Sequence, residues 1–238
     1  MEQFTVSNIK IDIVRKDIKN IHLAVYPPNG RVRIAVPTHI KDSTIKLFAA
    51  SQIGWIKRNK KKFLEQDREP KREFVTRESH YFLGKRYLLK VIEGDAKPKV
   101  ELKKKSYINL YVHPETSIEK KNNVFTEWYR AELKKLIPLY IEKWQKIIGV
   151  QVNDWGVKQM RTKWGSCNIK AKRIWVNLEL AKKPLHCLEY IVVHEMIHLL
   201  ERHHNDRFQH YLNKFMPKWK TYRNELNRLP VSHKDWEY

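Results

Sequence analysis

The residues best suited to chemistry lie in one short segment, His194-Glu-Met-Ile-His198. On a helix, side chains four positions apart lie one above the other on the same face, so His194 and His198 could hold one metal ion between them. Imidazole nitrogens bind zinc at about 2.0–2.1 Å. Glu195 would lie beside the open position of that metal, where a carboxylate can take a proton from a zinc-bound water. The segment therefore predicts a zinc site with Glu195 as its general base.

A catalytic zinc site uses three protein ligands and keeps one position open, so a third ligand is expected. Candidates lie just downstream, at His203 and His204. An unbroken helix would turn these side chains away from the first two, because it rotates by about 100° per residue. We therefore expect the helix to end near Arg202 and a new one to be capped at Asp206. The spacing does not choose between His203 and His204, and Glu225 of a later helix is a third option.

A second group of candidate site residues lies in the segment 161–167 and shortly after it. Arg161 could stabilise an oxyanion or hold a carboxylate or phosphate near the zinc, with an exposed strand arginine as the alternative. Trp164 is a candidate substrate contact. Asn177 could hydrogen-bond either this segment or the substrate backbone, and we favour the segment. Cys167 fits a small buried side chain better than a redox switch or a fourth ligand, which would close the open position.

The first third of the chain has the alternating pattern of strands. Apolar residues occupy every second position in three stretches before residue 37, and turn residues separate them. A helix is expected over residues 42–56, and strand patterning returns over residues 81–112. We therefore expect a β-rich amino-terminal domain over residues 1–122.

The second half of the chain changes to helical patterning and is expected to form a domain over residues 123–238. Apolar residues at helical spacing predict a long amphipathic helix over residues 124–148, which Gly149 ends. Two strands are then expected around a loop that carries residues 164–167. Pro184 begins the helix of the two histidines, since proline is favoured in a first turn.

A longer pattern connects these segments. It reads Arg161-x-x-Trp164-Gly165-Ser166-Cys167, Ile174-x-x-Asn177-x-x-Leu180, Pro184 and Tyr190-Ile-Val-Val-His194-Glu195-x-x-His198-Leu199-x-Glu201-x-x-His204-x-x-x-Phe208. This pattern resembles the YgjP-like family of predicted zinc metallopeptidases, which is also grouped with the M48 and SprT-like peptidases. The resemblance is strong over residues 150–229 and weaker over the amino-terminal strands.

The resemblance implies an α+β protein. An amino-terminal antiparallel β-rich region would precede a minimal zincin-like domain of long helix, β-hairpin, HExxH helix and carboxy-terminal helices. It implies that His194, His198 and His204 bind Zn²⁺ and that Glu195 is the general base. His203 stands where the family has asparagine, so the resemblance implies that it does not bind the metal.

Composition and charge limit the choice of function. The chain has 238 residues, 42% of them hydrophobic, and a formal net charge of +22, which excludes an acidic or wholly disordered chain. Two cysteines favour a reducing compartment over a disulfide-rich secreted protein. We expect a soluble, cytoplasmic protein with no membrane partner, because the sequence shows neither a secretory signal nor an apolar membrane-spanning run. The positive charge favours anionic substrates or nucleic-acid contact through the basic surface.

Three functions follow from these observations. We favour a zinc-dependent metallohydrolase, and specifically a metallopeptidase that cleaves peptides or proteins with a zinc-activated water. One alternative uses the same site on an anionic nucleotide, as a nucleoside triphosphate (UTP-type) pyrophosphatase. Another is a basic nucleic-acid-associated protein with a structural zinc, whose binding would not depend on Glu195. The sequence carries no information on oligomeric state.

Overall fold

The computed structural model describes residues 2–26, 29–65, 70–103, 106–160 and 163–230. These residues form two compact units, one within Met1–Glu69 and one within Pro70–Ser232. The change from strand to helix patterning near residue 122, where the sequence suggests a domain boundary, falls inside the second unit.

The first unit is built on a four-stranded sheet with the order β1-β2-β4-β3. Its strands are β1 (Glu2–Val6), β2 (Ile9–Lys16), β3 (His22–Tyr26) and β4 (Arg31–Pro37). β1 pairs antiparallel with β2, and β3 with β4. β4 lies parallel to β2, because β3 occupies the far edge and β4 returns between them. The apolar side chains of the sheet share one core with α1 (Asp42–Ser51) and α2 (Ile53–Glu65).

The second unit begins with a sheet of the same design, ordered β5-β6-β8-β7. Its strands are β5 (Ser79–Phe82), β6 (Lys85–Glu93), β7 (Lys99–Lys103) and β8 (Tyr107–Val112). The inner pair, β6 and β8, is again parallel. The first hairpin of each sheet turns through two residues with positive φ, Ser7-Asn8 and Leu83-Gly84, as tight hairpin turns require. The β-rich character expected before residue 113 is thus confirmed, although each sheet contains one parallel pair.

A three-stranded sheet follows, with the order β10-β11-β9. Its strands are β9 (Asp154–Lys158), β10 (Gly165–Asn168) and β11 (Arg173–Asn177). β10 pairs antiparallel with β11, whereas β9 lies parallel to it, so the expected hairpin consists of β10 and β11. The expectation of a loop over residues 164–167 is wrong from Gly165 onward. That stretch has no alternating apolar pattern, and pairing with β11 makes it a strand.

Short helical elements complete the second unit. They are the 3-10 helix η1 (Leu178–Lys182) and the helices α4 (Leu185–Ile197), α5 (Asp206–Phe215) and α6 (Trp219–Arg228). None of the helices in the described part of the chain combines the length and the apolar character that a membrane crossing requires.

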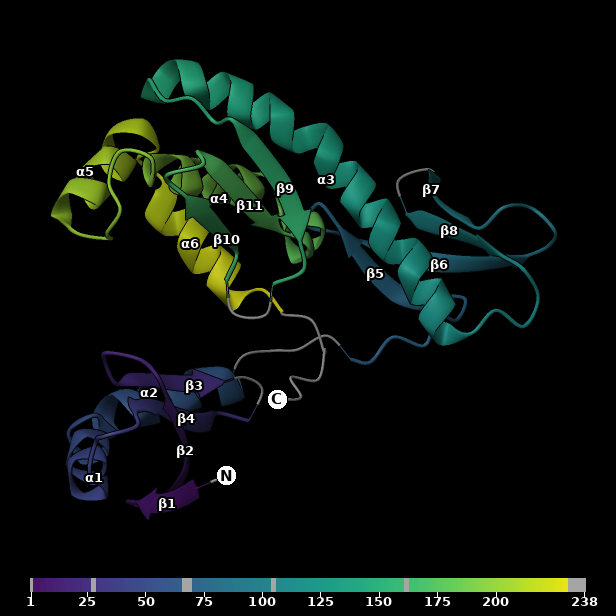
Figure 1. The fold of residues 1–238 in the computed structure, drawn as a ribbon. Helices are drawn as coiled ribbons and strands as arrows, with labels where there is room; N and C mark the ends of the chain where they lie inside the picture. Colours follow the sequence, from purple (N-terminus) through teal and green to yellow (C-terminus); the bar gives the residue numbers. More distant parts are fainter. Residues whose placement is uncertain (1, 27–28, 66–69, 104–105, 161–162, 231–238) are drawn as a thin grey trace. The chain divides into compact units, whose positions relative to one another are not determined.

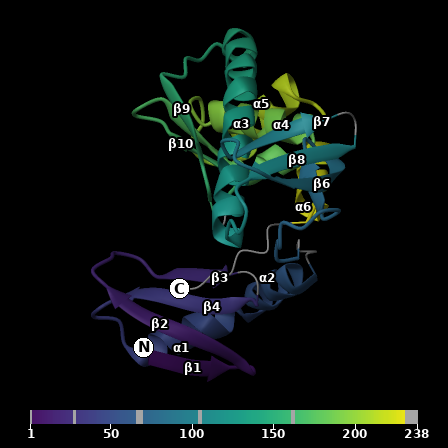
Figure 2. The same ribbon diagram turned by 90° about the vertical axis from the view of Figure 1, so that its right-hand side faces the viewer.

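The second unit has two layers: the β5–β8 sheet, and the β9–β11 sheet with the shorter helices. One long helix, α3 (Ile118–Ile148), connects them. The Ser117 side chain caps its start by accepting a hydrogen bond from the Lys120 amide, and Gly149 ends it in a left-handed conformation with φ of 77°. α3 contacts β7 and β8 as well as β9, η1 and α4. Figure 1 shows it crossing from the β5–β8 sheet to β9, and in Figure 2 the two sheets lie on opposite sides of it. The expected α+β class is confirmed.

Candidate metal centre

The two histidines of the HExxH segment lie at the end of α4. This helix is buried on most sides, because it packs against α3, α6, β10 and β11. Its last turn carries His194 and Glu195, and His198 is its carboxy-terminal cap. The helix ends at Ile197, so the expected end near Arg202 is wrong by about one turn. One further hydrogen-bonded turn follows His198, in which the Glu201 amide donates to the Ile197 carbonyl (3.0 Å), and the loop begins there.

The loop between α4 and α5 brings His204 back to the other two histidines. The Glu201 carboxylate shapes this loop by accepting a hydrogen bond from the His203 amide (3.1 Å). The Asn205 side chain caps α5 by accepting a hydrogen bond from a first-turn amide (3.0 Å), so the expected cap at Asp206 is wrong. These bonds hold the loop with residue 204 facing the helix end.

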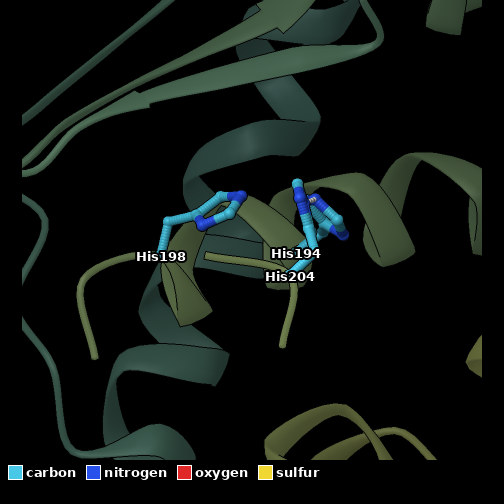
Figure 3. A group of neighbouring side chains, drawn as sticks. All are labelled: His194, His198 and His204. Carbon is cyan, nitrogen blue, oxygen red and sulfur yellow. Dashed lines mark hydrogen bonds between the residues drawn. The ribbon is translucent and has the colours of Figure 1, made fainter. Parts of the chain in front are cut away.

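The imidazoles of His194, His198 and His204 converge on one point. One ring nitrogen of each lies within 4.8 Å of the others, and the Nε2 atoms of His194 and His204 are 2.9 Å apart. Figure 3 shows the rings of His194 and His204 beside each other, with the His198 ring facing them. His203 belongs to no such group within the described ranges. The geometry therefore favours His204 over His203.

The three rings are in a form that can bind a metal ion. The His198 Nδ1 lies 3.1 Å from the Glu201 carbonyl oxygen, which can only accept, so Nδ1 carries the proton and Nε2 is free. Burial, together with the charges of His198 and His204, lowers the pKa of His194 to about 3. Burial also lowers the pKa of His198 and His204. A tetrahedral site with metal–nitrogen bonds of about 2.0–2.1 Å separates its nitrogens by roughly 3.3 Å, so the spacing fits a metal ion.

Phe208 packs against all three imidazoles. Its ring centroid lies 4.9 Å from that of His194, 4.7 Å from His198 and 4.8 Å from His204. The Phe208 side chain is 1% exposed. An aromatic ring in van der Waals contact with three imidazoles limits the rotamers that each can adopt. The sequence pattern includes Phe208, but spacing alone gives no sign of this contact.

Glu195 lies against the backbone of β10 at Gly165. A Cβ atom at Gly165 would lie 2.6 Å from the Glu195 Oε1 and 2.8 Å from its Cγ, so only glycine leaves room for this carboxylate. The Glu195 side chain is 5% exposed. Burial raises the pKa of Glu195 to about 8, against the opposing charge of Lys163. The site thus contains a buried carboxyl group beside three neutral imidazoles.

Cys167 lies on β10, two residues beyond Gly165. Burial, followed by the charge of Glu195, raises the pKa of the Cys167 thiol to about 11. A protonated thiol is a poor metal ligand and a poor nucleophile. Cys167 is absent from the histidine group, and it is only partly buried, whereas the sequence predicts a fully buried small side chain.

Asn177 fastens the segment that precedes β10. Its side-chain amide donates to the carbonyls of Met160 (3.0 Å) and Lys163 (2.7 Å), and its backbone amide donates to that of Trp164 (2.9 Å). The side-chain oxygen accepts from the Met160 and Glu179 amides. These bonds agree with the favoured role of Asn177 in holding this segment.

The two remaining candidate substrate contacts stay predictions. The Trp164 side chain is half-buried and packs against the main core of the second unit. Arg161 lies outside the described residues.

A second group of possible metal ligands has a different explanation. The His186 Nε2 lies 2.6 Å from a Glu225 carboxylate oxygen, which makes a direct hydrogen bond between α4 and α6. The Cys187 thiol points to the Tyr222 carbonyl (3.8 Å), and burial raises its pKa to about 12. Each polar group therefore has a partner without a metal. Glu225, a possible third ligand from the sequence, lies in this group and not beside His194.

Comparison with known proteins places the chain among the metallopeptidases. The family model described as YgjP-like, metallopeptidase domain matches residues 19–229, which is most of the chain. The chain belongs to the YgjP-like family. Among solved structures, it is similar to the metallopeptidase zymogen of Methanocaldococcus jannaschii jannalysin, with 19% identity, a TM-score of 0.34, and coverage of 38% of this chain and 92% of that one. No curated protein matches.

Proposed function

We propose that the protein is a zinc-dependent metallopeptidase in which His194, His198 and His204 hold Zn²⁺ and Glu195 is the general base. The observation that carries the proposal is the convergence of three neutral imidazoles within 4.8 Å of one another, next to a buried carboxyl group. Three histidine ligands with one open position are typical of catalytic zinc. Membership in a metallopeptidase family supports a metal ion and a peptide substrate.

The roles of the protein residues follow from their surroundings. When bound, zinc would polarise the scissile carbonyl and acidify a water molecule. The positive charge of bound zinc would favour the ionised form of the Glu195 carboxyl. In that form Glu195 takes a proton from the attacking water and returns it to the leaving amine. Gly165 leaves the space beside β10 that the Glu195 carboxylate occupies, and the Glu201 carbonyl holds His198 in one tautomer. Phe208 keeps the three rings convergent.

The substrate is proposed to bind along β10. This strand is an edge of its sheet, since β11 is its one neighbour in the described sheet order. An edge strand offers free backbone groups to an extended peptide. Its residue Gly165 touches Glu195, so a peptide paired with β10 would pass the proposed base. Peptide hydrolysis therefore agrees with the position of this edge.

Metal content tests the ligands, and activity tests the base. Wild type, His203→Ala and Glu195→Gln should each bind one zinc ion per chain. His204→Ala removes a ligand itself, so its zinc affinity should fall by more than the roughly 10–100-fold that follows the loss of a ligand's hydrogen-bond partner. An unfolded protein substrate should be cleaved by wild type, but not after chelation or by Glu195→Gln. Full activity of Glu195→Gln would refute the role of the base. Glu195-dependent hydrolysis of nucleoside triphosphates without any peptide cleavage would replace the proposal with a pyrophosphatase.

A further inference from the structure

A dense group of cations lies on α2 of the first unit. Five of the six residues 57–62 are lysine or arginine, and the helix has one acidic residue, Glu65. The histidines and the carboxyl group of the proposed peptidase site belong to the other unit. The charge of α2 is therefore a feature that the proposed function leaves unexplained.

The apolar side of α2 is closed against the core of its own unit. Ile56 is 0% exposed, and Phe63 packs on the same core. Lys57, Arg58 and Lys61 are exposed. Residues three or four positions apart are neighbours on a helix surface, so these three side chains form one band on the solvent side. Burial of the apolar side thus holds the cations in a fixed direction.

The acidic residues that make ion pairs in the first unit make them with its strands. Three carboxylates bind arginines of β2 and β4, in the pairs Arg15–Glu2, Arg15–Asp42 and Arg31–Asp12. In contrast, Lys57 and Arg58 have no ion-pair partner among the residues that the structure describes. Neighbouring like charges that the protein does not neutralise attract a partner with several negative charges.

An exposed aromatic ring lies within one turn of these cations. The Trp55 side chain is 39% exposed, and Arg58 follows it by three residues. The Arg58 guanidinium bends back over the preceding turn, because a Cβ atom at Gly54 would lie 3.5 Å from its Nη1. The Asn59 side-chain amide donates to the Trp55 carbonyl (2.9 Å) in the same turn. An indole ring and a guanidinium group therefore leave the helix close together.

We propose that α2 binds single-stranded nucleic acid, with Lys57 and Arg58 on phosphates and Trp55 stacked on a base. Aromatic rings on a basic surface bind single strands in this way, because unpaired bases offer their faces for stacking. An anionic membrane fits less well, since a basic helix on a membrane inserts its apolar face, and the core occupies that face of α2. The inference goes beyond the proposed peptidase function and does not depend on it.

The salt dependence of binding tests the phosphate contacts. Anisotropy is measured for the full chain with labelled oligothymidylate and oligouridylate of about 20 nucleotides, longer than typical single-strand sites. Each phosphate contact on a single strand adds about 0.7 to the slope of log affinity against log salt, so Lys57→Gln/Arg58→Gln should reduce that slope by about 1.4. The matched control is Lys134→Gln/Lys170→Gln, which removes the same charge from exposed positions of the second unit and should keep the wild-type slope.

Substitution of Trp55 tests the stacking. Trp55→Ala should weaken binding by about tenfold, as expected for the loss of one stacked base, and should leave the salt slope unchanged. Trp55→Phe keeps an aromatic ring and should recover most of this loss. A duplex of the same length should bind less tightly than either single strand. Binding of either oligonucleotide in this pattern supports the proposal, and comparison of the two distinguishes DNA from RNA.

Other results would overturn the inference. Equal changes of slope in both double variants would show attraction to the overall charge and not to α2. Duplex binding as tight as that of single strands, or an unchanged affinity in Trp55→Ala, would refute stacking. Binding to phosphatidylserine vesicles without binding to oligonucleotides would replace nucleic acid by a membrane.

Zinc and peptide cleavage separate this inference from the proposed function. Zinc content and cleavage of a peptide should be the same in wild type and Lys57→Gln/Arg58→Gln, and chelation should leave oligonucleotide binding intact. Loss of binding on chelation would place the contact in the second unit and refute the role of α2. If no peptide is cleaved while the α2 variants weaken oligonucleotide binding, the proposed function fails and this inference stands.

Discussion

Replacement of Gly165 by alanine should displace the proposed general base. The new Cβ would lie 2.6 Å from the Glu195 Oε1, 2.8 Å from Cγ and 2.9 Å from Cδ, whereas ordinary contacts begin at 3.4 Å. The carboxylate oxygen must therefore move by about 0.8 Å. Because Glu195 is 5% exposed, its neighbours must move with it, and such overpacking costs about 1–3 kcal/mol of unfolding free energy. A displacement of about 1 Å at a reacting group costs on the order of 100-fold in kcat.

Denaturant unfolding and peptide cleavage measure the two effects. Gly94→Ala is the matched control, since a Cβ there meets no atom within 4 Å, and it should change neither quantity. In the Glu195→Ala background the clashing atoms are gone, so Gly165→Ala should lose most of its cost in stability. A double-mutant cycle gives this difference directly. The reasoning is refuted if Gly165→Ala destabilises both backgrounds equally, or if it keeps full stability and activity in the native one.

Three further changes test other parts of the second unit. Phe208→Ala should lower the free energy of unfolding by about 3–5 kcal/mol and weaken metal binding in a chelator competition, whereas Phe208→Leu should do less; unchanged metal affinity in Phe208→Ala would contradict its proposed role. Asn177→Ala leaves several backbone groups unpaired and should cost about 1–3 kcal/mol, which chemical denaturation would show; a negligible cost would contradict its role. Burial alone would raise the pKa of Glu78, but His80 and other partners outweigh it and hold the pKa at about 2, against 4.5 in the unfolded chain. Protons therefore favour unfolding, so stability should fall as the pH drops from 4.5 towards 2, and Glu78→Gln should reduce that fall; an identical acid profile would contradict it.

The parts of the site that depend on one helix were predictable. His194 and His198 need four-residue spacing and a buried helix, and both are local properties of the sequence. The third histidine depends on a loop whose path is set by Glu201 and Asn205. Their hydrogen bonds to backbone amides cannot be read from the spacing of apolar residues. The sequence alone therefore did not decide whether His203 or His204 is the third histidine of the group.

The strand order could not be derived from the alternating pattern. Each of the two four-stranded sheets has a parallel inner pair because β3 and β7 take the outer edges. Which strands pair is decided by contacts between distant segments of the chain, and a local alternating pattern does not contain that information. β10 was missed for a similar reason. Its residues Gly165–Asn168 are small or polar, and the strand exists through pairing with β11 and contact with α4.

The long helix α3 has a consequence for how the second unit unfolds. At 31 residues it is about 46 Å long, and its buried residues Leu133 and Ile137 are 0% exposed. Because it packs on the β5–β8 sheet and on the layer that carries the histidines, neither layer can lose it and keep its core. The two layers should therefore melt in one cooperative transition. A destabilising substitution in the β5–β8 sheet would then increase the unfolded fraction of the whole unit. It would disrupt the candidate metal centre in this way without any contact to the histidines.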